Sequence, residues 1–236
     1  MKRITLLIVI CILSFNDVVA QFNGKQFTSD LFILDEYIKR QNKGIDFTET
    51  DTYTGTPYNH PSYLLGNVYR GNELLATDVA LRYNAIADEM EIKESITSSD
   101  DDAKVLTKSP DIFVKIMDDI YVFVPYQGGV EGGGYFQVMF EGKKVDFFKK
   151  IVKDFTEAKK ATSSITRDIP ARFVDKPVYY LVTKEGKFYE FPNSRSKKMK
   201  VFGERKDEMK KYINEKRLDL NDEKDLKKAI LYFDTL

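Results

Sequence analysis

The chain has 236 residues, of which 37 are Lys or Arg and 37 are Asp or Glu, so its formal net charge is zero. A balanced charge argues against nucleic acid as the main partner, because phosphate binding needs a concentrated basic surface. The 17 Phe and 14 Tyr residues favour strands, since aromatic side chains are enriched in β-sheets.

The first twenty residues (1–20) have the three parts of a cleavable secretory signal. A charged start precedes an apolar run over residues 4–15, and the small residues Val18 and Ala20 stand before the cleavage site. The apolar run is too short to span a bilayer, which needs about 20 residues. The sequence therefore predicts a periplasmic or extracellular protein that begins at Gln21 and has no transmembrane segment.

The cysteine content restricts the chemistry of the mature chain. The single cysteine, Cys11, lies inside the signal. A lipoprotein cysteine follows a small residue at the end of the apolar run, whereas Cys11 follows Ile10 and lies earlier in the run, so we expect no lipid anchor. Without that cysteine the mature chain has no disulfide, no thiolate metal site and no cysteine nucleophile.

Residues 21–62 form a weakly patterned N-terminal lead. Within it, residues 46–62 are rich in Thr, Gly, Pro and Asn, which indicates a loop. A short helix is predicted before this loop, capped by Ser29 or Asp30, from apolar residues at helical spacing. These residues are Leu31, Leu34, Tyr37 and Ile38.

Residues 63–192 have the pattern of an antiparallel β domain, in which short apolar strands alternate with tight turns. The predicted turns are Gly71–Asn72, Asp118–Asp119, Gly142–Lys143 and Glu185–Gly186. Residues 121–124 and 178–182 are apolar without interruption. In a sheet with one solvent-exposed face, apolar and polar residues alternate along each strand. We therefore expect a meander that is curled into a barrel or sandwich, or covered on its second face.

Residues 193–236 change to a helical period and predict a helical hairpin packed on the β domain. Met209, Tyr212 and Ile213 share one helical face, and Asn221 is the expected cap of a second helix. The apolar stripe of that second helix consists of Leu226, Ala229, Ile230 and Phe233.

Catalytic motifs are hard to find in this sequence. His60 is the only histidine, and a Ser-His-Asp triad would have to use it, but no G-x-S-x-G elbow is present. We interpret His60 as a turn residue before Pro61. A hydrolase using carboxylates or His60 stays open as an alternative, although no spacing singles out a pair of carboxylates.

Three further runs have simple structural interpretations. Residues 100–102 (Asp-Asp-Asp) lack the alternating ligands and glycine of a calcium loop, so they predict a solvated connection. The glycines at 128, 129 and 132–134 match no phosphate-binding loop and indicate a hairpin tip that could serve in recognition. The basic run 195–200 is typical of a solvated helix face. We thus assign no metal, cofactor or catalytic residue.

Arg82 and Tyr83 stand out as polar or amphipathic groups in an otherwise apolar strand. They are candidate contact residues. The favoured interpretation, however, is an arginine at a strand edge that packs on a tyrosine, because such cation–π pairs are common in ordinary folds.

Several segments together resemble a family of exported β-rich proteins of Gram-negative bacteria. They are LRYN at 81–84, DEMEIK at 88–93, GGGYFQVMFEGK at 132–143, IPARFVDKPVYYLV at 169–182 and the C-terminal run from Tyr212. The resemblance covers about residues 55–236. It implies secretion and a β-rich body with a helical tail, and it brings no activity, substrate or catalytic residue.

These observations favour a non-enzymatic module that binds an envelope protein or a small apolar ligand. One alternative is a carrier whose curled sheet holds a lipid or another small apolar molecule, and the other is the hydrolase.

Overall fold

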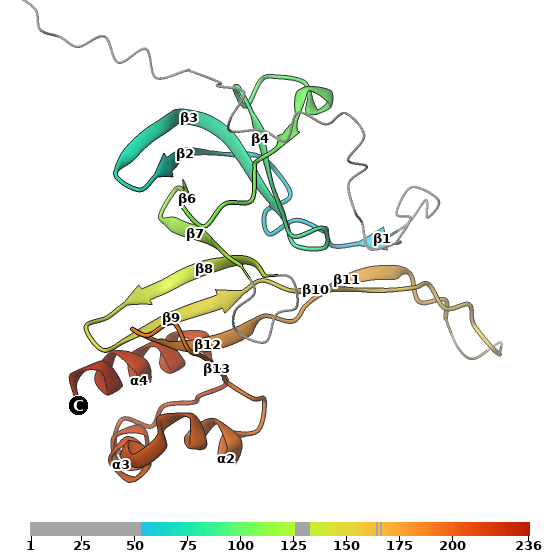
Figure 1. Ribbon diagram of the computed structural model, residues 1–236. Coiled ribbons are helices and arrows are strands. Elements are labelled where there is room, and N and C mark those ends of the chain that lie inside the picture. The colour runs from blue at the N-terminus through green and yellow to red at the C-terminus, as the bar shows by residue number, and fades with distance from the viewer. Residues whose placement is uncertain (1–52, 126–132, 164, 166) are drawn as a thin grey trace, which may run out of the picture.

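The computed structural model describes residues 53–125, 133–163, 165 and 167–236, and Figure 1 shows the course of the chain. The fold is mainly β, as the sequence predicted, with a large antiparallel sheet and C-terminal helices. The predicted helix around residues 31–38 lies outside the described residues. Within the predicted loop 46–62, residues Tyr53–Thr54 form a short strand, β1.

In the described ranges, the large sheet has ten strands in the order β13-β12-β9-β8-β7-β6-β2-β3-β4-β5. It contains β2 (Leu64–Arg70), β3 (Glu73–Asn84), β4 (Glu89–Lys93), β5 (Lys104–Val105), β6 (Ile112–Ile116), β7 (Asp119–Val124), β8 (Gly134–Glu141), β9 (Val145–Lys150), β12 (Val178–Thr183) and β13 (Phe188–Glu190). Among the described residues, strands β13 and β5 are its two edges, so the sheet is not closed, and the barrel, one of the forms that the sequence left open, is wrong.

The turns explain why neighbouring strands follow one another so closely. Gly71 follows β2 with a φ of 54°, and Gly186 follows β12 with a φ of 77°, backbone angles that favour glycine. The turn predicted at Asp118–Asp119 is wrong by one residue. Asp119 pairs with Ile116 across the ladder, so the turn consists of Met117 and Asp118, with Met117 at a φ of 52°.

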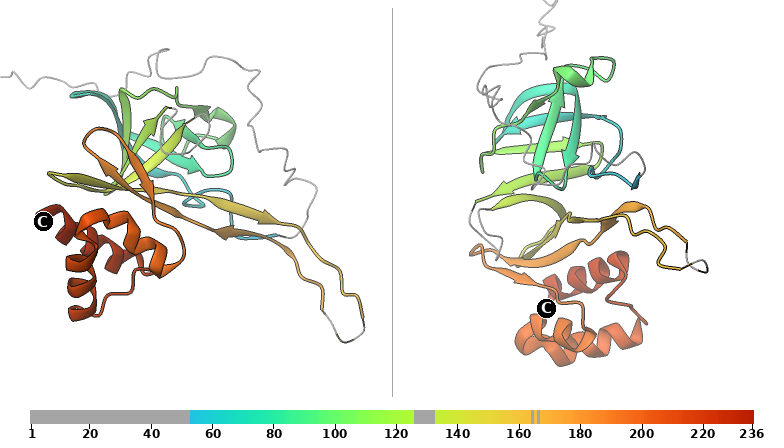
Figure 2. Two further views of the ribbon diagram at one scale, coloured as in Figure 1. Left: turned by 60° about the horizontal axis from the view of Figure 1, so that its bottom comes forward. Right: turned by 90° about the vertical axis from the view of Figure 1, so that its right-hand side faces the viewer.

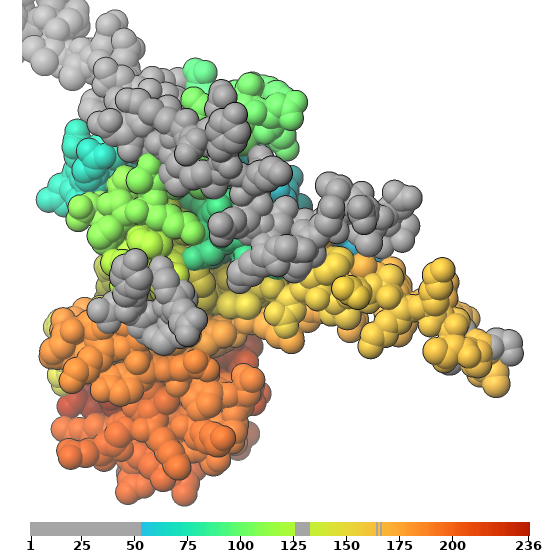
Figure 3. All heavy atoms as spheres, turned by 45° about the vertical axis from the view of Figure 1, so that its right-hand side comes forward, coloured from blue at the N-terminus to red at the C-terminus, as the bar shows by residue number. Residues whose placement is uncertain are grey.

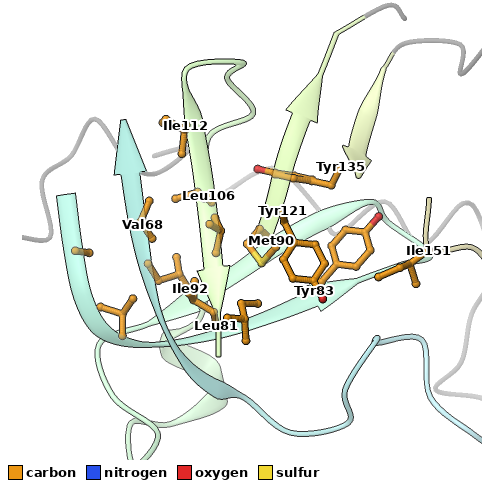
Figure 4. Close-up of a cluster of buried hydrophobic side chains, with 14 of the residues drawn as sticks. Val68, Leu81, Tyr83, Met90, Ile92, Leu106, Ile112, Tyr121, Tyr135 and Ile151 are labelled. Carbon is orange, nitrogen blue, oxygen red and sulfur yellow. The ribbon is translucent and has the colours of Figure 1, made fainter. Parts of the chain in front are cut away.

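The first hydrophobic core gathers side chains from strands that lie well apart in the sheet order (Figure 4). The ring of Tyr83 in β3 lies 5.7 Å from that of Tyr121 in β7 and 6.0 Å from that of Tyr135 in β8. Met90 and Ile92 of β4 fill the same cluster and are fully buried. One face of β2, β6 and β7 is therefore covered by side chains of β3 and β4.

The C-terminal segment folds into helices, as the sequence predicted. They are α2 (Arg195–Lys198), the 3₁₀ helix η3 (Met199–Arg205), α3 (Lys206–Glu215) and α4 (Glu223–Thr235). The predicted cap is displaced by one residue: Asp222, not Asn221, caps α4, and its side chain accepts a hydrogen bond from the backbone N–H of Asp225. The apolar stripe of α4 packs in one core with Phe147 of β9 and Leu181 of β12.

Both ends of α4 are fastened to the β8–β9 hairpin. At its N-terminus, Glu223 pairs with Lys149 Nζ of β9 at 2.7 Å and also accepts a hydrogen bond from the Tyr179 hydroxyl of β12 at 2.8 Å. At its C-terminus, the Asp234 carboxylate accepts the backbone N–H groups of residues 143, 144 and 145 at 2.9, 2.7 and 3.0 Å. A side chain at Gly142 would collide with Asp234, so the glycine there permits this approach.

We expect the attachment of α4 to weaken in acid. Burial alone would raise the pKa of Asp234 and of Glu223, but backbone donors at Asp234 and the Lys149 and Tyr179 donors at Glu223 lower both pKa values. Carboxylates with lowered pKa values stabilise the fold above the ordinary carboxyl pKa of about 4, and this contribution is lost as the pH falls through the folded-state values.

Asp234→Asn should therefore reduce the free energy of unfolding by about 1–2 kcal/mol at pH 7, because a neutral amide accepts the three N–H groups more weakly. In urea denaturation the difference from the wild type should shrink towards pH 3. Asp118→Asn, in an exposed turn, serves as the control. A difference that is equal at both pH values would contradict the assignment.

A smaller, three-stranded sheet has the order β1-β11-β10, with β10 (Lys153–Thr156) and β11 (Ala171–Asp175) as its hairpin. We call residues 153–175 the arm. Figure 2 shows the arm standing out from the body, and the space-filling view in Figure 3 shows it as a projection. The described residues between 157 and 170 are all exposed, and Ile165 near the tip is 92% exposed.

Candidate functional site

The two faces of the large sheet can be followed residue by residue from its register, because directly opposed residues share a face. Tyr69 of β2 lies opposite Phe113 of β6, which lies opposite Val122 of β7, and Val122 lies opposite Phe136 of β8. A second row on the same side runs from Val138 of β8 through Phe148 of β9 to Tyr180 of β12. Large apolar side chains thus cross the sheet on one side.

We call this side the aromatic face. It consists of Tyr69, Phe113, Val122, Val124, Phe136, Val138, Phe148, Val178, Tyr180, Val182 and Phe188. At its centre, Phe136, Phe148, Tyr180 and Val182 are buried, and the flanking valines and Phe188 are only partly buried. Every member of this cluster comes from a strand, whereas the helices pack in a different cluster.

The opposite face is covered along its length. Val114 and Tyr121 belong to the first core, under the side chains of β3 and β4. Further along, Lys149 and Tyr179 contact Glu223 of α4. The strands that looked apolar on both sides in the sequence therefore bury one side under β3, β4 and the helices, and their other side forms the aromatic face.

Aromatic rings on this face touch across several strands. Phe136 of β8 lies 5.6 Å from Tyr180 of β12 and 5.4 Å from Phe188 of β13, measured between ring centroids. Tyr180 and Phe188 are 5.9 Å apart. Burial and the nearby Glu190 carboxylate raise the pKa of Tyr180, which keeps its hydroxyl neutral. The face combines apolar rings with a polar hydroxyl that can donate.

A buried polar cluster borders the aromatic face. Lys150 Nζ lies 5.3 Å from the centre of the Phe136 ring and pairs at 2.5 Å with Asp88, which follows β3 at a φ of 55°. The same Asp88 oxygen accepts the Tyr83 hydroxyl at 2.5 Å and the backbone N–H of Tyr135 at 3.1 Å. Burial and the charge of Asp88 raise the pKa of Tyr83. This cluster ties the β3–β4 turn to β8 and β9 and so fixes the border of the face.

The structure separates the two candidate contact residues Arg82 and Tyr83. Arg82 stacks between the rings of Tyr58 and Tyr63, at 3.7 and 4.0 Å, and pairs with Glu91 at 2.8 Å, whereas Tyr83 points into the first core. The expected cation–π packing is thus present, although its partners are two tyrosines that lie earlier in the chain. Arg82 is not at a sheet edge, because β3 lies between β2 and β4.

The described residues around His60 do not form the arrangement of hydroxyl and carboxylate groups that a hydrolase would need. His60 is exposed in a bend between Asn59 and Pro61. In the described part of the chain, no hydrogen bond or ion pair joins His60 to a hydroxyl or carboxylate. The described residues also contain no group of three His, Cys, Asp or Glu side chains arranged to hold a metal ion.

The remaining runs have local roles. Asp100 starts a 3₁₀ turn, η2 (Asp100–Asp102), and receives Lys93 Nζ at 2.7 Å, so the acidic run also fastens a connection to β4. Residues 126–132, with most of the glycines, lie outside the described residues. In the basic run 195–200, most side chains are exposed, but Lys198 is buried and donates to the carbonyl oxygen of Leu220 at 2.7 Å.

No protein-family model, curated protein or solved structure matches this chain. Among the described residues, no helix has both the length and the apolar character needed to cross a membrane.

Proposed function

We propose that this protein is an exported, non-enzymatic binding module of the cell envelope, and that the aromatic face binds its partner. The observation that carries the proposal is the asymmetry of the large sheet. One side is covered by β3, β4 and the helices, and the other side bears a continuous row of aromatic and branched side chains that are only partly buried at its margin. The signal-like residues 1–20 support export, with cleavage after Ala20.

Apolar patches of this kind are typical of interaction surfaces. The valines and Phe188 at the margin of the aromatic face are only partly buried, and adjoining apolar side chains that stay in contact with water mark interaction surfaces in soluble proteins. Aromatic residues are enriched at protein interfaces, because a rigid ring buries much area for little loss of conformational entropy. Tyr69 and Phe113, stacked at 4.8 Å on the same face, extend the patch towards β2.

A charge placed on the aromatic face tests the proposal. The mature protein, immobilised as bait, should retain one or more envelope proteins from an extract, and Val138→Lys should abolish that retention. Leu231→Lys, on the exposed side of α4, is the matched control and should retain the same proteins. Circular dichroism melting checks that both variants are folded. Equal retention by Val138→Lys and the wild type would remove the aromatic face from the proposal.

A second candidate, a carrier of a small apolar ligand, is favoured by the ring contacts between Phe136, Tyr180 and Phe188. In a flat sheet, β8 and β13 would lie about 14 Å apart at the usual strand spacing. A centroid distance of 5.4 Å between their rings favours a sheet that bends around this cluster, and a bent aromatic surface suits a small apolar molecule. Native mass spectrometry distinguishes the two functions: a carrier retains a small ligand that Val138→Lys loses, and a protein-binding module shows the bare chain mass.

A further inference from the structure

Strand β13 is an edge of the large sheet with an accessible outer side. It pairs with β12 on one side, and no other strand in the described part of the chain pairs with it. Glu190 is exposed, and Tyr189 is 45% exposed. An unpaired edge of this kind can accept a strand from another chain, and many proteins recognise extended peptides in this way.

The hydrogen bonds to β12 show which backbone groups of β13 point outward. The N–H of Thr183 in β12 donates to the carbonyl oxygen of Lys187 at 2.9 Å, and four residues further on the N–H of Phe191 donates back to β12 at 2.8 Å. Residues that bond to the neighbouring strand alternate along an antiparallel ladder. The backbone N–H and C=O groups of Phe188 and Glu190 therefore point away from β12.

The side chains of these two residues continue the aromatic face to the edge. Phe188 lies opposite Val182, and Glu190 lies opposite Tyr180, so both side chains are on the aromatic face. The Phe188 ring contacts Phe136 at 5.4 Å but is only partly buried. A residue of an added strand that lies opposite Phe188 would share this face and cover the exposed part of the ring.

Glu190 gives the edge a preference for charge. In the part of the chain that the structure describes, its exposed carboxylate forms no ion pair. A lysine or arginine opposite Glu190 would form a cross-strand ion pair on the aromatic face. In an antiparallel strand, this basic residue comes two positions before the apolar residue that lies opposite Phe188. The edge therefore favours an extended segment with a basic residue, any residue and then an apolar residue.

A second copy of β13 fits this edge poorly. An antiparallel pair centred on Phe188 would place Glu190 opposite Gly186, which precedes the strand in a turn with a φ of 77°. A pair centred on Tyr189 would place Phe188 opposite Glu190 twice, and a pair centred on Glu190 would oppose two carboxylates. The edge thus favours a different polypeptide.

We propose that β13 binds an extended segment of the partner protein as an additional antiparallel strand, with an apolar residue opposite Phe188 and a basic residue opposite Glu190. The proposal rests on the proposed function, because it names the part of the partner that the margin of the aromatic face holds. Backbone hydrogen bonds to the edge supply affinity for an extended chain, and the two side-chain contacts supply selectivity.

Hydrogen exchange measured by NMR on the mature protein tests the pairing. In the free protein the amide of Tyr189 should exchange slowly, and the amides of Phe188 and Glu190 should exchange rapidly. The synthetic peptide Val-Thr-Lys-Thr-Val-Thr-Val-Thr, added at millimolar concentration, should slow both outward amides about tenfold or more and leave Tyr189 unchanged. Outward amides that are already protected in the free protein, or that the peptide does not protect, would overturn the proposal.

A second peptide, with Glu in place of the Lys, tests the register. In fluorescence anisotropy the wild type should bind the Lys peptide about fivefold more tightly than the Glu peptide, and Glu190→Lys should reverse this preference. Glu185→Lys, an exposed charge reversal in the turn before β13, should keep the wild-type preference. If Glu190→Lys also kept it, the assigned register would be wrong.

Glu190→Pro separates this proposal from the proposed function. Proline removes the outward N–H at position 190 and leaves the N–H groups that bond to β12, a position that an edge strand tolerates. This variant should keep the circular dichroism melting of the wild type and lose both the Lys peptide and the retained envelope proteins.

The envelope extract then distinguishes the two failures. If Glu190→Pro retained the envelope proteins that Val138→Lys loses, the aromatic face would bind its partner without strand addition, so the proposed function would stand and this proposal would fall. If both variants retained those proteins, both proposals would fall.

Discussion

Arg82→Met should lower the free energy of unfolding by about 3–5 kcal/mol, which is the usual cost of removing one partner of a buried ion pair. The side chain of its partner Glu91 is only 1% exposed, so water cannot solvate the carboxylate when the guanidinium is removed. Burial lowers the pKa of the Arg82 guanidinium, but the hydrogen bonds and charge of Glu91 outweigh this effect and raise it. Glu91 thus stabilises the charged form of Arg82.

The same change also loosens the segment before β2. The guanidinium holds Tyr58 and Tyr63 by stacking and donates to the carbonyl oxygen of Pro61 at 3.4 Å. Tyr63 in turn donates to Glu91 at 2.7 Å, and burial followed by the charge of Glu91 raises the pKa of Tyr63. Arg82→Met should therefore increase proteolysis of residues 57–63 before the sheet itself unfolds.

Urea denaturation of a double-mutant cycle measures the coupling. Arg82→Met/Glu91→Leu should recover much of the loss, because two apolar side chains leave no buried charge. The control Arg70→Met, at an exposed position of β2, should change stability by less than about 0.5 kcal/mol. If Arg82→Met and Arg70→Met had the same free energy of unfolding, the ion pair would contribute little to stability. Arg82 would then again be a candidate contact residue for a partner.

The sequence predicted the elements that depend on local patterns. Tight turns such as Gly71–Asn72 and Glu185–Gly186 need particular backbone angles, and only a few residue types supply them, so their positions were recognisable. The errors at Asp118–Asp119 and at Asn221 were one-residue displacements. In both, neighbouring polar residues compete for one position, and tertiary pairing decides between them: Asp119 joins the ladder, and Asp222 caps α4.

The candidate site could be predicted only in part. Continuous apolar runs at 121–124 and 178–182 indicated strands that bury both sides. Which strands combine into one face depends on a sheet order in which β2 lies between β6 and β3, and β9 lies between β8 and β12. Strands β2 and β6 are distant in sequence, as are β9 and β12, and no local pattern specifies that they pair. Arg82 and Glu91 lie opposite each other in the consecutive strands β3 and β4, but no turn was predicted between these strands, so their register could not be predicted either.

Deleting residues 204–236 should yield an insoluble protein or one that binds an apolar fluorescent dye. The deletion removes α3 and α4 and uncovers Val145, Phe147 and Leu181, which are 6%, 0% and 3% exposed in the intact protein. Each such side chain contributes about 1.5–3 kcal/mol when it is buried. Because a domain is stable by only about 5–15 kcal/mol, this loss is comparable with the whole stability of the fold.

A second deletion provides the matched control. Replacing residues 157–170 with a short Asn-Gly turn removes the outer part of the arm, whose described residues are all exposed, so the body should stay folded with the dye signal of the full-length chain. A soluble, folded chain without residues 204–236 that binds no more dye than this control would refute the docking of α4. Such a result would also count against the aromatic face as a binding surface, since that role requires the helices to cover the opposite side of the same strands.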